Sequence, residues 1–321
     1  MEPLQLIRAS EFEVKEVQWL WYPYIPYGKI TLLQGDPGDG KSTFVLALCA
    51  LLTSGSPLPF QPRGQPPVNV VYQTTEDDAA DTVVPRFIRA GGERGRLLFI
   101  NEQDKRLTFG DERILQAIQR TGAQLLVLDP LSSYIGQNAS INMANDVRAQ
   151  FNPLIDAARE TGCAILVVAH MNKMAGAKAI YRTTGSVDVV GAVRSSLLIA
   201  RTGKERPDER IMAVQKSNLA PTGKAVLFSV GETVEWISET DKTADEVLSG
   251  YAPCIGRPGV QLEQALALLQ AALAKGPAPQ AAVEEQAKAA GVGWGTVKKA
   301  KAALGVRSAR KGGVWFWSLP P

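Results

Sequence analysis

The sequence predicts an α/β fold with a central, mainly parallel β-sheet. Between residues 28 and about 230, short apolar runs alternate with segments of helical periodicity, as expected where helices connect parallel strands. A glycine-rich loop separates the first of these runs from an apolar helical segment. Helical and hairpin patterns resume beyond residue 259, behind a stretch rich in glycine and proline, which predicts a second, smaller domain.

The apolar runs of the first domain are predicted to be its strands. They are residues 30–33, 68–72, 97–100, 125–128, 164–168, 195–200, 211–214 and 225–230. The runs at 125–128 and 164–168 are the most strand-like, and the segment 145–161 between them has apolar side chains at helical spacing. The last three runs follow one another closely, which predicts an antiparallel extension of the sheet.

The domain boundaries follow from the glycine and proline residues. We expect a first domain over residues 1–245, a linker over 246–259 and a second domain over 260–321. The second domain is predicted to contain three helices and a β-hairpin with a basic, glycine-containing turn. These helices are residues 262–273, 281–290 and 294–304, a turn covers 276–279, and the hairpin covers 306–319.

The composition and the apolar runs indicate in which cellular compartment the protein is found. Hydrophobic residues make up 45% of the chain and charged residues 21%, which is typical of a soluble globular protein. The longest apolar run, residues 44–52, is far shorter than the ~20 residues that span a bilayer. The N-terminus has no signal-peptide pattern, and the three cysteines have neither metal-ligand nor disulfide spacing. We therefore expect a cytoplasmic protein with no membrane partner.

Positive charge is concentrated at the C-terminal end. Residues 257–321 contain nine Lys or Arg against three acidic residues, a net charge of +6. The rest of the chain has 26 basic and 29 acidic residues, a net charge of −3. This distribution is compatible with a polyanionic partner, and equally with a basic face that only contacts solvent.

The glycine-rich loop has the composition of a phosphate-binding loop. Its residues are Gly35, Asp36, Pro37, Gly38, Asp39, Gly40, Lys41, Ser42 and Thr43. Backbone N–H groups of such a loop can surround the β- and γ-phosphates, and the positive end of the following helix faces the same anion. Lys41 would contact the phosphates and Ser42 would bind Mg²⁺. We predict a site for ATP and Mg²⁺, with a purely structural glycine turn as the alternative.

Three polar residues follow predicted strands and should meet at one edge of the sheet. Asp129 is expected to hold Mg²⁺ through water, or else to form a turn before Pro130. Glu76 is expected to orient and polarise the attacking water, with Asp77 as the substitute base. His170, the only histidine, is expected to sense the γ-phosphate. The alternatives are a first-turn helix acid for Glu76 and a structural hydrogen bond for His170.

The order of these motifs resembles the RecA-like hexameric helicases, and most closely the RepA-type plasmid and phage ATPases. The matching stretches are 25–29, 35–43, 71–78, 126–134, 168–173, 185–186 and 194–195, within a resemblance over residues 16 to about 230. The resemblance implies that Lys41 and Ser42 bind phosphate and Mg²⁺, and that Asp129 also binds Mg²⁺. It further implies that Glu76 is the catalytic base and His170 the γ-phosphate sensor.

The resemblance also implies an oligomer. Arg194 would be an arginine finger that reaches the nucleotide of the neighbouring subunit, so the resemblance implies a homo-oligomeric ring of six subunits. Related replicative helicases carry Lys-x-Arg on a late strand, whereas this chain has Lys216-Ser217-Asn218. Lys216 is still expected to contact the γ-phosphate in trans, but the finger then depends on Arg194 alone. A surface or structural arginine is the alternative.

Two basic segments are candidate DNA contacts. Residues 171–184 contain Lys173, Lys178 and Arg182 and no acid, which suits a channel loop along single-stranded DNA, although an ordinary exposed loop has the same composition. The C-terminal region resembles a winged helix-turn-helix. Its expected contacts to duplex or fork DNA are Lys298, Lys299 and Lys301 on the recognition helix, and Arg307, Arg310 and Lys311 on or near the wing. A protein-docking module is the alternative.

Together these features predict an ATP-driven motor on single-stranded DNA, a hexameric replicative helicase of a plasmid, phage or other mobile element. Two other functions are compatible with the same residues. The first is a RecA-like DNA-dependent ATPase that does not unwind DNA and serves recombination, loading or regulation. The second is a DNA-binding regulator in which ATP is a switch.

Overall fold

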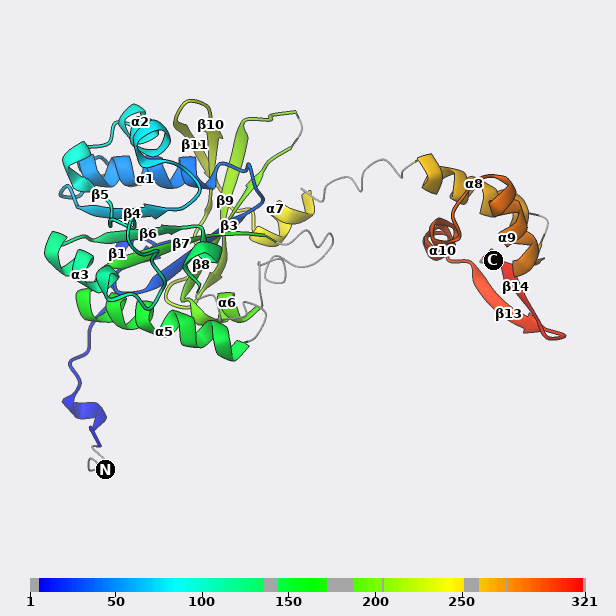
Figure 1. Ribbon diagram of the computed structural model, residues 1–321, viewed down its shortest axis with the longest axis horizontal. Coiled ribbons are helices and arrows are strands. Elements are labelled where there is room, and N and C mark those ends of the chain that lie inside the picture. Colours follow the sequence, from blue (N-terminus) through cyan, green and yellow to red (C-terminus); the bar gives the residue numbers. More distant parts are fainter. Residues whose placement is uncertain are drawn as a thin grey trace. The chain divides into compact units, whose positions relative to one another are not determined.

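The chain forms two compact units, Met1–Tyr251 and Ala252–Pro321, each with its own apolar core (Figure 1). The computed structural model describes residues 6–135, 144–171, 187–203, 205–250, 260–274 and 276–319.

The first unit is built on a nine-stranded sheet with the order β11-β10-β9-β8-β3-β7-β6-β4-β5, counted over the residues that the structure describes. The strands are β3 (Ile30–Gly35), β4 (Val70–Thr74), β5 (Leu97–Leu98), β6 (Leu125–Asp129), β7 (Ala164–His170), β8 (Ser195–Arg201), β9 (Glu209–Ser217), β10 (Ala225–Val230) and β11 (Val234–Thr240). All pairs from β5 to β8 are parallel, and those from β8 to β11 are antiparallel. The predicted mainly parallel sheet with an antiparallel extension is confirmed.

The structure differs from the predicted sheet in several details. The strand predicted at 97–100 is shorter and ends at Leu98. Strand β8 pairs in parallel with β3, so the antiparallel extension begins at β9 and not at β8. Strand β11 was not predicted, because its side chains are mostly half-buried or exposed and its sequence therefore lacks an apolar run.

Helices cover both faces of this sheet (Figure 1). They are α1 (Lys41–Ser54), α2 (Val84–Arg89), α3 (Glu112–Thr121), α4 (Leu131–Tyr134), α5 (Ala144–Thr161), α6 (Val187–Ala192) and α7 (Ala244–Gly250). Neighbouring strand residues enter opposite cores because strand side chains alternate: Leu33 packs with α1 and α2, and Leu32 packs with α3, α5 and α6. In the described ranges, no helix has both the length and the apolarity to cross a membrane.

Helix α7 overlaps the predicted linker, which was expected to begin at residue 246. Ala244, Val247 and Leu248 are buried against residues of β8 and β9, including Leu198 and Ala213. Burial of these apolar side chains stabilises a helix where the glycine and proline pattern predicted an irregular segment. The first unit therefore keeps regular structure up to Gly250.

An aromatic cluster fixes the start of the chain against α1. The small sheet of β1 (Trp19–Trp21) and β2 (Ile25–Pro26) precedes β3, and shorter 3₁₀ or π turns lie at Ala9–Glu11, Ala79–Val83 and Arg94–Arg96. Trp21 lies 6.3 Å from Phe44 of α1, and Phe44 lies 5.0 Å from Phe228 of β10, between ring centroids. These contacts hold the first turns of α1, which the phosphate loop precedes.

Over its described residues, 260–274 and 276–319, the second unit contains three helices and a three-stranded antiparallel sheet. Its elements are α8 (Val260–Leu273), β12 (Ala278–Pro279), α9 (Gln280–Ala289), α10 (Trp294–Ala303), β13 (Arg307–Lys311) and β14 (Val314–Ser318). The sheet order is β12-β14-β13, so the segment predicted as a turn at 276–279 contributes a short strand. Trp294 stacks on Trp317 with ring centroids 5.4 Å apart, and both belong to the core around Leu269, Val283 and Val297.

Candidate nucleotide-binding site

The phosphate loop lies between the end of β3 and the start of α1, and its backbone requires glycine. A Cβ on Gly35 would lie 2.5 Å from the carbonyl oxygen of Ile199 on the neighbouring strand β8. Gly38 and Gly40 have φ angles of 79° and 81°, in the left-handed region that other residues rarely adopt. The three glycines therefore allow the close approach and the tight turn that a phosphate-binding loop needs.

Lys41 is buried at the base of this loop. Its Nζ donates hydrogen bonds of 3.0 Å to the carbonyl oxygens of both Gly35 and Asp36. Burial lowers the pKa of Lys41, and the surrounding carboxylates, led by Asp39 and Asp129, oppose that shift. The ammonium group is thus held at the loop, where it can contact bound phosphate oxygens.

Asp129 and Ser42, the two residues expected to bind Mg²⁺, contact each other directly. The Oγ of Ser42 donates a 2.7 Å hydrogen bond to Oδ2 of Asp129, and the Tyr72 hydroxyl donates a longer one of 3.3 Å to the same oxygen. Asp129 is 4% exposed, and this burial raises its pKa despite those two hydrogen bonds. A hydroxyl and a carboxylate fit Mg²⁺, whose remaining ligands would be water and nucleotide oxygens.

His170 connects Lys41 to Glu76. Its Nδ1 lies 3.3 Å from Nζ of Lys41, and its Nε2 lies 3.4 Å from Oε1 of Glu76. Because an ammonium group can only donate, Nδ1 accepts from Lys41, and Nε2 then carries the ring hydrogen that faces the carboxylate. The Glu76 side chain is 55% exposed, so its other oxygen can be reached by water.

Asp77 faces a different partner. Its Oδ2 lies 3.0 Å from an Nη atom of Arg86 on α2, in a half-exposed ion pair. The structure therefore brings Glu76, and not the substitute base Asp77, to the residues of the phosphate loop. Three predicted strand-end residues, Glu76, Asp129 and His170, meet at one edge of the sheet.

Arg201 at the end of β8 is a residue of this site that the sequence did not indicate. Its Nε donates to Oδ1 of Asp39 at 3.1 Å, and an Nη atom donates to the carbonyl oxygen of Gly38 at 3.1 Å. Asp39 in turn accepts a hydrogen bond from the backbone N–H of Asp36 through Oδ2, at 3.2 Å. Burial raises the pKa of Asp39 and the bond from Arg201 opposes this. No sequence signal links Arg201 to a loop 162 residues away.

Arg194 and Lys216 lie near the amino-terminal end of β8, at the opposite end of the strands from the phosphate loop. Arg194 directly precedes β8, and Lys216 pairs with Ser196 at the same end of that strand. A strand of six or seven residues at ~3.3 Å per residue separates them from the phosphate loop by roughly 15–20 Å. Neither residue can therefore contact a nucleotide on its own loop.

Lys216 has partners within its own chain. Its Nζ donates to the carbonyl oxygens of Val190, in the last turn of α6, and Val193, directly after that helix, at 2.7 Å and 2.9 Å. Burial lowers the pKa of Lys216, and the positive charges of Arg194 and Arg148 lower it further. The structure shows a helix-capping contact for this lysine, and its expected contact with a phosphate in trans stays a prediction.

The predicted DNA contacts divide into two groups. Lys173, Lys178 and Arg182 lie outside the residues that the structure describes. In the second unit, Lys298, Lys299 and Lys301 lie on α10, and Arg310 and Lys311 lie on β13. Lys301 is engaged locally, because its Nζ donates to Oγ of Ser308 at 2.6 Å and lies 4.3 Å from the Trp317 ring centroid. Lys298, Arg310 and Lys311 are exposed.

Comparison with known proteins places this site in a family. The DNA repair protein RadA of Halalkalibacterium halodurans is 26% identical over 214 residues, which are 64% of this chain and 40% of RadA. The chain therefore spans less than half the length of that relative. The crystal structure of the RadB recombinase covers 67% of this chain and 93% of its own, with 16% identity and a TM-score of 0.46. A family model described as an AAA domain matches residues 1–176, more than half of the chain. The chain belongs to this AAA domain family.

Proposed function

We propose that the chain hydrolyses ATP at the carboxyl edge of its parallel strands. The observation that supports the proposal is a set of contacts at that end of the strands. Ser42 contacts Asp129, and His170 contacts both Lys41 and Glu76. The loop N–H groups and Lys41 would bind the phosphates, while Ser42 and Asp129 would hold Mg²⁺. Bound Mg²⁺ would neutralise charge on the phosphate oxygens.

Glu76 would act as the general base. His170 donates to Oε1 of Glu76, and because the Glu76 side chain is 55% exposed, its other oxygen, Oε2, could accept a proton from water. The water oxygen forms a bond to the terminal phosphorus as the bond between that phosphorus and the bridging oxygen breaks, and Glu76 takes the proton. Lys41 stabilises the negative charge that develops on the phosphate oxygens.

We further propose that hydrolysis drives a hexameric motor along single-stranded DNA. Arg194 supports this, since its position far from its own phosphate loop fits a role in trans. The basic composition of residues 171–184 supports a DNA contact at the end of β7. The exposed Lys298, Arg310 and Lys311 support duplex or fork binding by a winged-helix unit over residues 260–321.

A second candidate is a DNA-dependent ATPase that does not unwind DNA and acts in recombination or repair. The likeness to a DNA repair protein over 64% of the chain favours it. Both candidates require Mg²⁺-dependent turnover that rises with single-stranded DNA, and they differ in strand displacement.

The test is a pair of assays on the full chain. Phosphate release is measured with and without single-stranded DNA, and displacement of a labelled strand is measured on a fork with ATP. A motor that unwinds should be positive in both assays. Stimulated turnover without displacement would select the second candidate. Nucleotide binding without turnover would contradict both and indicate a switch.

A further inference from the structure

The hairpin of β13 and β14 carries an exposed aromatic side chain near its turn (Figure 1). Trp315 of β14 is 49% exposed, whereas Trp317 on the same strand is 2% exposed and stacks on Trp294 of α10. Because alternate side chains of a strand share a face, Trp315 continues the aromatic face of Trp317 towards the turn, beyond the core. An isolated exposed aromatic residue is common on protein surfaces, so its neighbours decide what it can bind.

The neighbours of Trp315 on the hairpin are positively charged. Arg310 lies directly opposite Trp315 in the pair of β13 and β14, so the two side chains share a face. The Nε of Arg310 donates a 3.4 Å hydrogen bond to the carbonyl oxygen of Gly313 in the turn. Arg307 and Lys311 are also exposed, and the sequence of the hairpin contains no acidic residue. The surface around the indole ring therefore suits an anionic partner.

Helix α10 packs on the same face of the hairpin. The Nζ of Lys301 donates to Oγ of Ser308 at 2.6 Å and lies 4.3 Å from the ring centroid of Trp317. Ser308 lies opposite Trp317 in the strand pair, and both share the face that carries Trp315. The exposed Lys298 lies one turn before Lys301 on that helix, and α10 contains no acidic residue. The cations of α10 and the exposed indole ring thus belong to one side of the second unit.

A nucleobase beside a phosphate backbone fits this surface. An indole ring offers a flat face on which any base can stack, and the adjacent guanidinium group can contact a phosphate. Inside a duplex each base is covered by its neighbours, so a base face is accessible only at an unpaired nucleotide or at the last base pair.

We propose that Trp315 stacks on the base at a junction between single-stranded and duplex DNA, while Arg310 contacts the adjacent phosphate. The cations of α10 would hold the duplex side of the junction. This inference rests on the proposed DNA binding by the second unit, and it adds the DNA structure that the unit selects.

The affinities of full-length Trp315→Ala for three DNAs test the stacking contact. They are a forked DNA, one single strand of that fork, and a relaxed, covalently closed duplex circle that has neither ends nor unpaired bases. Fluorescence anisotropy at one salt concentration measures each affinity. The affinity for the fork should fall by about 5- to 100-fold, as expected for the loss of one base–aromatic stack. The affinity for the circle should be unchanged, because it offers no base face. The affinity for the single strand should change little, because no duplex then holds a base beside Trp315.

Two further variants distinguish stacking from an ordinary apolar contact. Trp315→Phe keeps an aromatic ring and should retain much of the affinity for the fork. Trp315→Leu keeps an apolar side chain without an aromatic face and should bind the fork as weakly as Trp315→Ala. Tyr22→Ala is the matched control, since Tyr22 is an aromatic residue of the first unit that is 53% exposed. A fork with 2-aminopurine at the junction reports stacking directly: its fluorescence should be quenched by the wild-type chain and not by Trp315→Leu.

Several outcomes would overturn the proposal. An equal loss of affinity for the fork and the circle would show that Trp315 supports the second unit in general, and an equal loss for the fork and the single strand would show that no junction is selected. Wild-type affinity of Trp315→Leu for the fork would make Trp315 an apolar docking contact for a protein.

The wild-type chain separates this inference from the proposed function. If it binds both the fork and the circle while Trp315→Ala binds the fork equally well, this inference alone fails. If it binds neither DNA, the proposed DNA binding by the second unit fails, and this inference fails with it.

Discussion

The imidazole of His170 lies 3.4 Å from the carboxylate of Glu76, and its other ring nitrogen faces Lys41. The residue at the end of β7 thus contacts both the phosphate-binding lysine and the proposed base. A phosphate that draws Lys41 away from Nδ1 would change the hydrogen bonding of the ring. That change would reach Glu76, which contacts the other ring nitrogen.

Asp129→Asn should distinguish the contribution of Asp129 to folding stability from its proposed role in binding Mg²⁺. Burial raises the pKa of Asp129 in the folded chain above its ordinary value of 3.8, so the folded state binds this proton more tightly than the unfolded state. The contribution of Asp129 to stability is therefore fully present below pH 3.8 and is lost as pH rises through the raised pKa.

Without nucleotide, the asparagine variant should be at least as stable as wild type at pH 7, with a flatter dependence on pH above 4. Its stabilisation by MgATP should be reduced. Urea unfolding from pH 4 to pH 8, with and without MgATP, measures both effects. A variant that is less stable than wild type without ligand, yet fully stabilised by MgATP, would contradict the assignment.

Arg201→Ala should weaken ATP binding by loosening the phosphate loop. Two hydrogen bonds tie Arg201 to Asp39 and Gly38, and a charge-assisted bond contributes about 1.5–3 kcal/mol in favourable cases. Since the Arg201 side chain is 38% exposed, we expect a loss near the lower limit, or about a tenfold rise in KM. Arg201→Lys should recover part of it. A fall in kcat at unchanged KM would show that Arg201 acts on the reaction and not on the loop.

The phosphate loop and the strand-end residues could be predicted because their signals are local. Glycines at fixed spacing and polar residues after apolar runs identify Lys41, Asp129 and His170 without knowledge of the fold. The pairing of Asp39 with Arg201 could not be predicted, because only the sheet order brings β8 beside β3. Helix α7 was also missed, since its stability depends on burial against β8 and β9.

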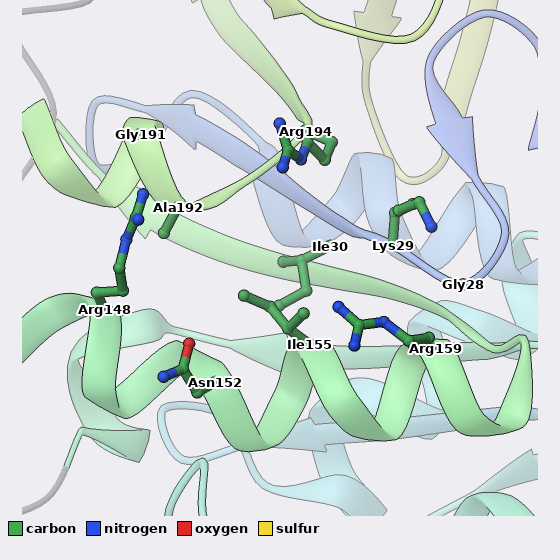
Figure 2. A pocket seen from close by; sticks show the side chains of 10 residues that line it. All are labelled: Gly28, Lys29, Ile30, Arg148, Asn152, Ile155, Arg159, Gly191, Ala192 and Arg194. Atoms are coloured by element: carbon green, nitrogen blue, oxygen red, sulfur yellow. The ribbon is translucent and has the colours of Figure 1, made fainter. Parts of the chain in front are cut away.

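A basic pocket of the first unit was equally hidden in the sequence (Figure 2). Lys29, Arg148 and Arg194 line it, yet they belong to different elements, and none lies in a run of basic residues. Their convergence follows from the packing of α5 beside the starts of β3 and β8. The net charge of the first unit does not reveal such a cluster, because acidic residues elsewhere in that unit outnumber its basic residues.

Arg194→Ala should hydrolyse ATP poorly while still assembling. An arginine supplied by a neighbour stabilises transition-state charge, and its loss reduces kcat by about 10³-fold or more. Mixing this variant with Glu76→Gln should restore part of the activity, because some contacts then join an intact Arg194 to an intact Glu76. Absence of recovery, with subunit mixing proven by native mass spectrometry, would argue against a role in trans.

Replacing Lys298 and Arg310 with alanine should weaken duplex or fork binding. Each lost phosphate contact should reduce the slope of log Kd against log salt by about one unit. Turnover stimulated by single-stranded DNA should persist, since neither residue belongs to the first unit. Lys288→Ala, on α9, is a control that removes one positive charge, as does each of the two replacements made singly. If the control reduces binding equally, the contribution of these residues is only net charge.

The direct test of the proposed chemistry is Glu76→Gln in full-length protein, with Asp77→Asn as its control. The substitution keeps the shape of the side chain and removes its basicity. Equilibrium binding of a fluorescent ATP analogue and the rate of phosphate release are measured on the same preparations. We predict that Glu76→Gln binds nucleotide like wild type and releases phosphate at least about 100-fold more slowly, while Asp77→Asn retains turnover. Turnover by Glu76→Gln near the wild-type rate would contradict the account.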